Sequence, residues 1–145
     1  MNGMSDVLTP PFDTKVAVLV RDDLETWQRL NVTAFLASGI AAANPQLIGE
    51  PYADADDQAY LAILGLPVLV FEGAKEHLVA ARERSLRREL PIAVYTSDMF
   101  RTGFDAANRA TVRAVHGSDL DLVGLAVHGP KNAVDKILKG SRLHP

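Results

Sequence analysis

Lys15-Val16-Ala17-Val18-Leu19-Val20-Arg21 is a run of five apolar residues between two basic ones. Strands that are covered on both faces of a sheet carry such continuous apolar runs, whereas strands with one wet face alternate apolar with polar residues. The stretch therefore predicts the first and most central strand of a sheet that has helices on both faces.

The rest of the chain continues this alternation of strands and helices. Apolar runs predict further strands at 61–64, 67–71, 91–96 and 120–128, the first two forming an antiparallel pair around a turn at Gly65. Helical patterns run from the Asp22-Asp23 cap to Ala43 and cover 74–90 and 105–116, and a last helix begins at Gly129-Pro130 and ends at Gly140. Strands separated by helices indicate a three-layer α/β/α domain with a mixed sheet of four or five strands.

Residues 22–58 predict a capped, buried helix and then a loop. Asp22 and Asp23 are suited to cap the free backbone N–H groups of the first helix. Residues 30–43 are apolar almost all the way round, which predicts a buried helix. The polar, Asp-rich stretch 49–58 predicts a loop.

Length and composition predict one ordinary globular domain. The chain has 145 residues, of which 48% are hydrophobic and 23% charged. Residues 1–14 carry Pro10-Pro11 and no periodic pattern, so we expect a loosely ordered N-terminal arm followed by a single domain over 15–145.

Several functional classes are disfavoured by features that the sequence lacks. A net charge of −3 argues against a broad nucleic-acid-binding face, and the absence of cysteine excludes disulfides and thiolate catalysis. The four histidines are scattered, and no glycine-rich phosphate loop follows the first strand. No apolar run approaches ~20 residues and no export signal is present, so we expect a cytoplasmic protein without metal, organic cofactor, nucleic acid or membrane partner.

A dense set of polar side chains follows the strand predicted at 91–96. It comprises Asp98, Arg101, Thr102, Asp105, Asn108 and Arg109. Loops at the carboxyl ends of buried strands are where α/β sheets usually bind ligands, so this is a candidate site. Asp98 is a general base if burial raises its pKa, or an orienting acceptor if Arg101 keeps it ionised.

Arg109 has two roles open to it. It is the cation best placed in the sequence to contact an anionic ligand, and it is also at the spacing that pairs it with Asp105 along a helix. Asp105 itself is most simply a helix cap.

The first helix supplies a second set of candidates. Trp27, Asn31, Phe35 and Ser38 share one helix face within an arc of about 60°, at 100° per residue. Asn31 and Ser38 need polar partners, which Asp98, Arg101 or Thr102 could provide. The set is either a buried polar network that joins helix to sheet, or the floor of a cleft.

These motifs resemble a bacterial family of unknown function within the type II peptidyl-tRNA hydrolase superfamily. The resemblance covers residues 15–43, 93–102 and 125–143, with hallmarks at 26–28, 30–35, 99–102, 105–109 and 131–139. The hydrolases themselves share an Arg-x-Asp-Leu turn, here residues 21–24, an Asp-x-x-Arg-Thr motif, here 98–102, and a closing Gly-Pro helix, here from Gly129. The resemblance implies a peptidyl-tRNA hydrolase II-like fold.

The first helix departs from the hydrolases at their polar residues. Asn31, Phe35 and Ser38 occupy the positions at which the hydrolases carry Lys, Gln and His. Because an Asn side chain provides neither a positive charge nor a titrating proton, we expect no efficient peptidyl-tRNA hydrolysis.

Two functions remain open. One is an enzyme that acts on a small-molecule or acyl substrate, with hydrolysis as the candidate reaction, with Asp98 and Thr102 catalytic and with Asn31, Ser38, Arg101 and Arg109 binding the ligand. The other is a ligand-binding or regulatory module without catalysis. Under either function we expect a small-molecule ligand in a cleft between the first helix and the Asp98 loop, and a homodimer.

Overall fold

The computed structural model describes residues 12–145 and places strand β1 (Thr14–Arg21) inside the sheet. β1 pairs in parallel with β4 (Val68–Gly73) and antiparallel with β6 (Leu122–Pro130), so that Val18 lies between Val70 and Ala126. The five apolar residues of β1 are fully buried. The expectation of a central strand covered on both faces is confirmed.

The complete sheet has five strands in the order β5-β6-β1-β4-β7. β5 (Ile92–Thr96) and β7 (Arg142–Leu143) pair antiparallel with their neighbours, so the sheet is mixed, as predicted. The strand pairs that make the sheet mixed are not the predicted antiparallel pair of 61–64 and 67–71. Residues 61–64 form no strand apart from an isolated bridge between Ile48 and Leu64, and β4 pairs with β1 and β7 instead.

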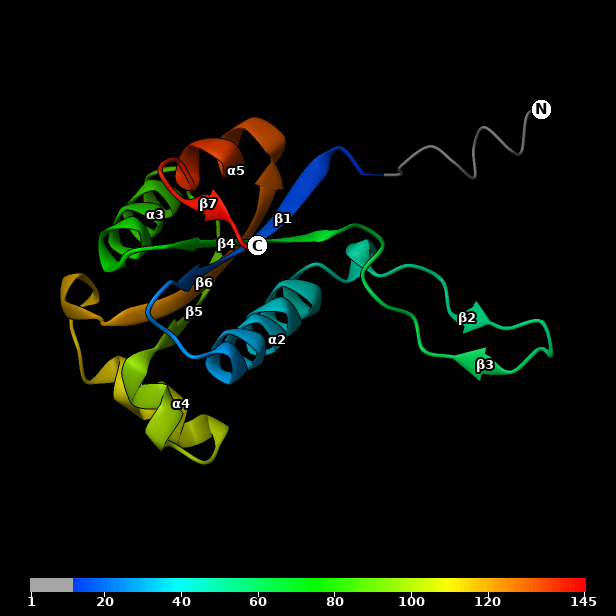
Figure 1. The fold of residues 1–145 in the computed structure, drawn as a ribbon, viewed down its shortest axis with the longest axis horizontal. Helices are drawn as coiled ribbons and strands as arrows, with labels where there is room; N and C mark the ends of the chain where they lie inside the picture. Colours follow the sequence, from blue (N-terminus) through cyan, green and yellow to red (C-terminus); the bar gives the residue numbers. More distant parts are fainter. Residues whose placement is uncertain (1–11) are drawn as a thin grey trace.

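Helices cover both faces of this sheet (Figure 1). On one face, α2 (Thr26–Ala43) packs on the β1 side chains Val16, Val18 and Val20. On the other, α3 (Lys75–Arg87) and α5 (Lys131–Ile137) pack on Ala17 and Leu19. α4 (Asp105–Arg113) lies beside the short 3-10 helix η2 (Ser97–Arg101) that follows β5.

Gly124 on β6 allows α2 to lie close to the sheet. A Cβ atom at this position would overlap Val32 Cγ1 and lie 2.9 Å from Leu36 Cδ1. Only a residue without a side chain fits below these two core residues, so Gly124 fixes the height of α2 above the sheet.

The helix ends differ from the sequence-based expectations. The residue before α2 is Glu25, whose backbone N–H donates to the Gln28 side chain, while Asp22 and Asp23 pair with Arg142 and Arg21. The carboxylates of Asp22 and Asp23 form ion pairs with arginine instead of capping the helix. Similarly, Asp105 is the first residue of α4 and pairs with Arg109, and Pro130 precedes α5 as the last residue of β6.

The prediction of a buried first helix is wrong for this chain by itself. Only Val32, Leu36 and Ile40 of α2 are buried, and Leu30 is 68% exposed. One face of the helix packs on the sheet, whereas the opposite side is exposed and carries Trp27, Leu30, Asn31 and Ser38, with no charged residue among them.

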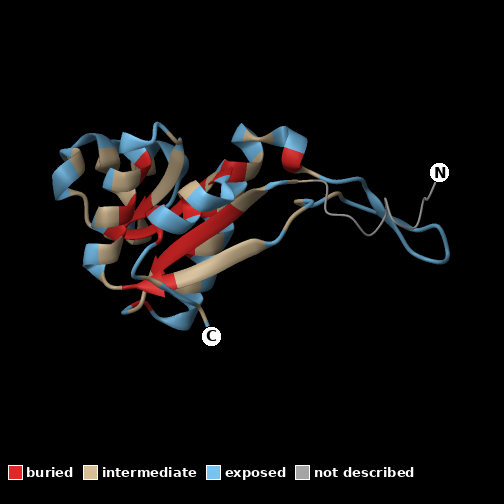
Figure 2. Ribbon diagram, turned by 90° about the horizontal axis from the view of Figure 1, so that it is seen from above, coloured by how far each residue is buried: buried red, intermediate tan, exposed pale blue. Residues whose placement is uncertain are grey.

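A β-hairpin projects from the body of the molecule between α2 and β4 (Figures 1 and 2). Its strands β2 (Tyr52–Ala53) and β3 (Ala59–Tyr60) fall at the ends of the stretch expected as a loop. The hairpin is exposed along its length, as Figure 2 shows. Of the expected N-terminal arm, residues 1–11 lie outside the described residues, while Thr14 begins β1.

Within residues 12–145 no helix combines the length and the apolar character that crossing a membrane requires.

Candidate functional site

A cleft of about 870 Å³ opens between α2, β5 and α4. Residues of α2 form one wall, β5 contributes the floor, and η2 and α4 form the other wall. The volume lies within the range of small-molecule sites. The cleft follows the end of β5, where the sequence placed a candidate site.

Aromatic side chains form much of the cleft. Ring centroids are 6.0 Å apart for Trp27 and Phe100, 5.2 Å for Phe100 and Tyr95, and 5.7 Å for Tyr95 and Phe35. This chain of rings links both walls across the floor. Burial raises the pKa of Tyr95, so its hydroxyl stays protonated over an extended pH range.

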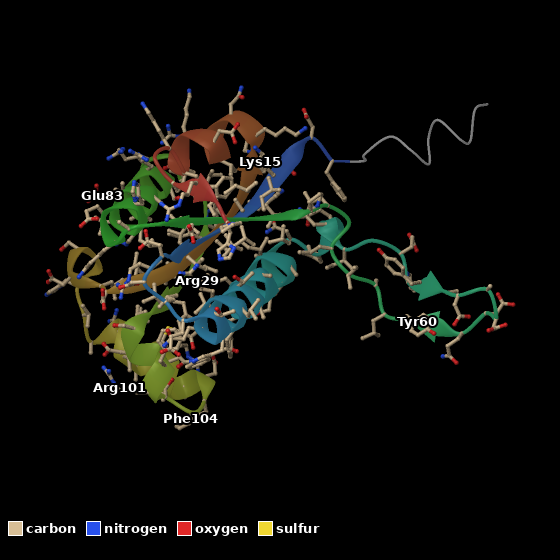
Figure 3. The ribbon with its side chains drawn as sticks, in the orientation of Figure 1. Lys15, Arg29, Tyr60, Glu83, Arg101 and Phe104 are labelled. Atoms are coloured by element: carbon tan, nitrogen blue, oxygen red, sulfur yellow. The ribbon has the colours of Figure 1, made fainter. Side chains whose placement is uncertain are left out.

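Three of the aromatic side chains at the cleft are more than half exposed. These are Trp27, Phe35 and Phe104. Figure 3 shows Phe104 at the outer end of the α4 region, pointing away from the sheet. Apolar rings that remain in contact with water around a concave surface are typical of a site that closes on a ligand.

Four of the predicted site residues line the cleft, namely Asn31, Ser38, Thr102 and Arg109. Ser38 donates its hydroxyl hydrogen bond to the carbonyl oxygen of Phe35, and Asn31 has no side-chain hydrogen bond to any residue in 12–145. The expected hydrogen bonds from Asn31 and Ser38 to Asp98, Arg101 or Thr102 are therefore absent from residues 12–145. The Asn31 amide stays available to a molecule in the cleft.

The hydroxyl of Thr102 is fixed by hydrogen bonds to residues of η2 and α4, the same wall of the cleft on which Thr102 lies. Its hydroxyl lies 2.9 Å from the carbonyl oxygen of Met99 and also contacts the side-chain oxygen of Asn108. These contacts join η2 to α4 and orient the hydroxyl. A nucleophilic hydroxyl needs a base beside it, and no carboxylate or imidazole contacts Thr102 within the described range.

The other two predicted residues, Asp98 and Arg101, are not among those that line the cleft. They pair with each other along η2, and both side chains are substantially exposed. In Figure 3 Arg101 points away from the body of the molecule. Asp105 and Arg109 also form an ion pair, which is the structural role that the spacing allowed.

Sequence reasoning missed several lining residues. Tyr95, Phe100, Phe104, Val112 and Arg113 contribute to the cleft, and Arg113 forms no ion pair within residues 12–145. The signal was Tyr95 near the end of β5 together with Phe100 and Phe104 on either side of Arg101, which become one surface only once α4 folds back.

A separate polar cluster lies at the carboxyl end of β1. Arg21 donates to Asp23 and Asp121 at 2.7 Å, and Lys75 lies 3.3 Å from Asp121. Burial opposes the charge of both Arg21 and Asp121. Hydrogen bonding outweighs it, so the pKa of Arg21 is raised and that of Asp121, which accepts from Ser97 and Arg21, is lowered. Arg21 and Lys75 are therefore paired with carboxylates of the same chain, Asp23 and Asp121.

Metal-ligating side chains do not converge in the described part of the chain. No group of three or more His, Asp or Glu in residues 12–145 could hold an ion. The cleft is lined by aromatic rings, the amides of Asn31 and Asn108, the hydroxyls of Ser38, Tyr95 and Thr102, the Asp105 carboxylate and the guanidinium groups of Arg109 and Arg113.

Comparison with known proteins places the chain in a family. Residues 14–145 match the model of the family described as a protein of unknown function, DUF2000. The chain belongs to the DUF2000 family. The match spans every element from β1 to β7, so the cleft and the hairpin both lie within the DUF2000 region.

Among solved structures, this DUF2000 chain is similar to the protein of unknown function Atu0240 from Agrobacterium tumefaciens strain C58. The two are 44% identical with a TM-score of 0.90, and the match covers 92% of this chain and 99% of the other. A search of curated proteins gave no match.

Proposed function

We propose that this protein binds a small molecule with an acyl or aromatic body and an anionic end in the cleft between α2 and α4. The observation that carries the proposal is the row of four aromatic rings across a cleft of about 870 Å³ that no side chain of residues 12–145 fills. An apolar body on these rings would remove half-exposed Trp27 and Phe35 from water.

Polar groups at the cleft support the choice of an anionic end. Arg113 lines the cleft without an ion pair in the described residues, and Arg109 beside it is neutralised by Asp105. Asn31 on the opposite wall offers an amide without an internal partner in residues 12–145. One guanidinium and one amide facing an apolar surface suit a carboxylate attached to an apolar chain.

Binding has more support than hydrolysis. The hydroxyl of Thr102 contacts an amide and a carbonyl oxygen, and Asp98 pairs with Arg101 outside the cleft lining. We further propose that the fold is of the type II peptidyl-tRNA hydrolase kind, on the strength of the 21–24 and 98–102 motifs, and that the activity is absent because Asn31 stands in place of lysine.

The single tryptophan of the chain, Trp27, is a built-in reporter of the cleft. We expect octanoate to change Trp27 fluorescence saturably, and 1-octanol, which lacks the carboxylate, to bind more weakly. Phe35→Ala should weaken octanoate binding about tenfold, because it removes a wall contact worth about 1.5 kcal/mol. Leu86→Ala on α3 is the matched control and should bind as the wild type does.

Two results would contradict the proposal. One is the absence of any saturable change in Trp27 fluorescence with octanoate. The other is an equal loss of affinity in Phe35→Ala and Leu86→Ala. An Arg113→Gln variant tests the anionic end separately, because it should weaken octanoate and leave 1-octanol unchanged.

A further inference from the structure

α2 is a surface helix whose exposed face has no charge. Its only charged residue is Arg29, whose guanidinium donates to Glu72 at 3.0 Å and to the backbone of Leu24 at 3.0 Å. Figure 3 shows Arg29 between α2 and the strands. Helices exposed to water on one side normally carry charged residues there, and a helix apolar all round is normally buried. The composition of α2 is therefore that of a buried helix, yet its outer face, with Leu30, is exposed in the single chain.

The β2–β3 hairpin (residues 49–63) projects beyond the carboxyl end of α2 (Figure 1). Four of its large side chains are more than half exposed, with Leu61 at 88%. They are Tyr52, Tyr60, Leu61 and Ile63. A two-stranded hairpin without a covering layer is only marginally stable in water, so a covering partner would stabilise this one.

The tip of the hairpin is nevertheless held in one shape. The carboxylate of Asp54 accepts hydrogen bonds from the backbone N–H groups of Asp56 at 2.9 Å and Gln58 at 3.0 Å, and from the Tyr60 hydroxyl at 2.7 Å. Figure 3 shows Tyr60 on the projecting strand, away from the body of the chain. A tip ordered in advance loses less conformational entropy when it docks.

Charge identifies the partner. Residues 30–74 contain no Lys or Arg, whereas 12 of the 15 basic residues of the chain lie in 75–145. The hairpin carries four acidic residues, Glu50, Asp54, Asp56 and Asp57. In a two-fold arrangement the acidic hairpin of one molecule would meet Arg109 and Arg113 of the other, which border the cleft and lie on the same side of the sheet as α2.

We propose that a second copy of this chain covers α2 and the hairpin, forming a two-fold dimer in which each hairpin lies on the body of the other subunit. Five side chains, Leu30 and the four of the hairpin, expose on the order of 600 Å² of surface, most of the ~800 Å² per partner of a standard interface. A two-fold arrangement uses the same patch on both subunits, which suits a surface made of one helix and one projecting hairpin. The dimer does not depend on the ligand of the cleft.

Sedimentation velocity tests the dimer. We expect the wild type to sediment as a dimer with a dissociation constant in the low micromolar range or tighter, and the double variant Leu61→Asp, Ile63→Asp to sediment as a monomer. Both side chains are exposed in the single chain, so the variant should keep its fold, which circular dichroism checks. Leu86→Asp places the same charge on an exposed leucine of α3 and should remain a dimer.

A second measurement is possible because the chain has no cysteine, so that one introduced cysteine can be labelled selectively. A fluorophore attached to a single Leu61→Cys site should be shielded from iodide quenching when the protein dimerises, whereas one at Leu86→Cys should be quenched equally at all protein concentrations. A monomeric wild type, or a dimer that keeps its affinity in the hairpin variant, would overturn the inference. The ligand proposal is tested independently, because the hairpin variant should still show the octanoate-dependent change in Trp27 fluorescence.

Discussion

The guanidinium of Arg29 on α2 donates a 3.0 Å hydrogen bond to the carboxylate of Glu72 on β4, which is only 7% exposed. Arg142 of β7 donates to the same carboxylate at 2.8 Å. One buried acid thus connects a helix, an inner strand and the carboxyl-terminal edge strand. Burying a carboxylate away from water is costly unless such hydrogen-bonding partners are present.

Removing Arg29 should destabilise the protein strongly. We expect Arg29→Met to lower the free energy of unfolding by about 2–4 kcal/mol, because Glu72 loses a partner and the carbonyl oxygens of Asp22 and Leu24 lose theirs. Arg142→Met should cost less, since that side chain is far more exposed. Urea denaturation of both variants checks the order, and equal losses would contradict this account.

Adding a methyl group below α2 should also be costly. We expect Gly124→Ala to lower stability by about 1–3 kcal/mol through its overlap with Val32, and Val32→Ala to relieve part of that loss in the double variant. Gly103→Ala is the control, because no atom lies within 4 Å of a Cβ at that position. Strictly additive effects of the two substitutions in chemical denaturation would show that the overlap does not determine the height of α2.

The stability of the protein should fall at mildly acidic pH in a way that His128 explains. Burial lowers the pKa of His128 below its ordinary value of 6.5, so the unfolded chain takes up a proton at higher pH than the folded chain. The free energy of unfolding therefore decreases as pH falls through that value. His128→Gln should show a smaller decrease in thermal unfolding between roughly pH 7.5 and 5.5, and identical profiles would refute the assignment.

We expect no efficient cleavage of peptidyl-tRNA. Replacing a cation that stabilises developing charge by a neutral amide typically costs about 10²- to 10³-fold in rate, and Asn31 is such a neutral amide. The measurement is single-turnover cleavage of an N-acylated aminoacyl-tRNA by the wild type and by Asp98→Asn. A fast reaction abolished in the variant would mean that hydrolysis survives without the lysine.

α2 shows which features could be predicted from the sequence and which depend on the tertiary structure. Its apolar composition predicts a buried helix, but composition does not say which element or molecule would cover each face. The structure shows one face on the sheet and the other, with Leu30, exposed. The position of the candidate site was likewise predictable from the polar stretch after β5, whereas the withdrawal of Asp98 and Arg101 from the cleft depends on their pairing across one turn of η2.

By itself the sequence determined the central place of β1, the alternation of strands and helices, and the left-handed turn at Gly140, where φ is +94°, although α5 already ends at Ile137. These features follow from local patterns, namely a continuous apolar run, alternating periodicities and a residue that tolerates a left-handed backbone. Only the tertiary structure decided that β4 joins β1 in parallel, that two residues near the carboxyl terminus form β7, and that five aromatic residues distant in sequence share one cleft. Such pairings depend on which surfaces meet after the chain has folded, and short segments carry too little pattern to specify their partners in advance.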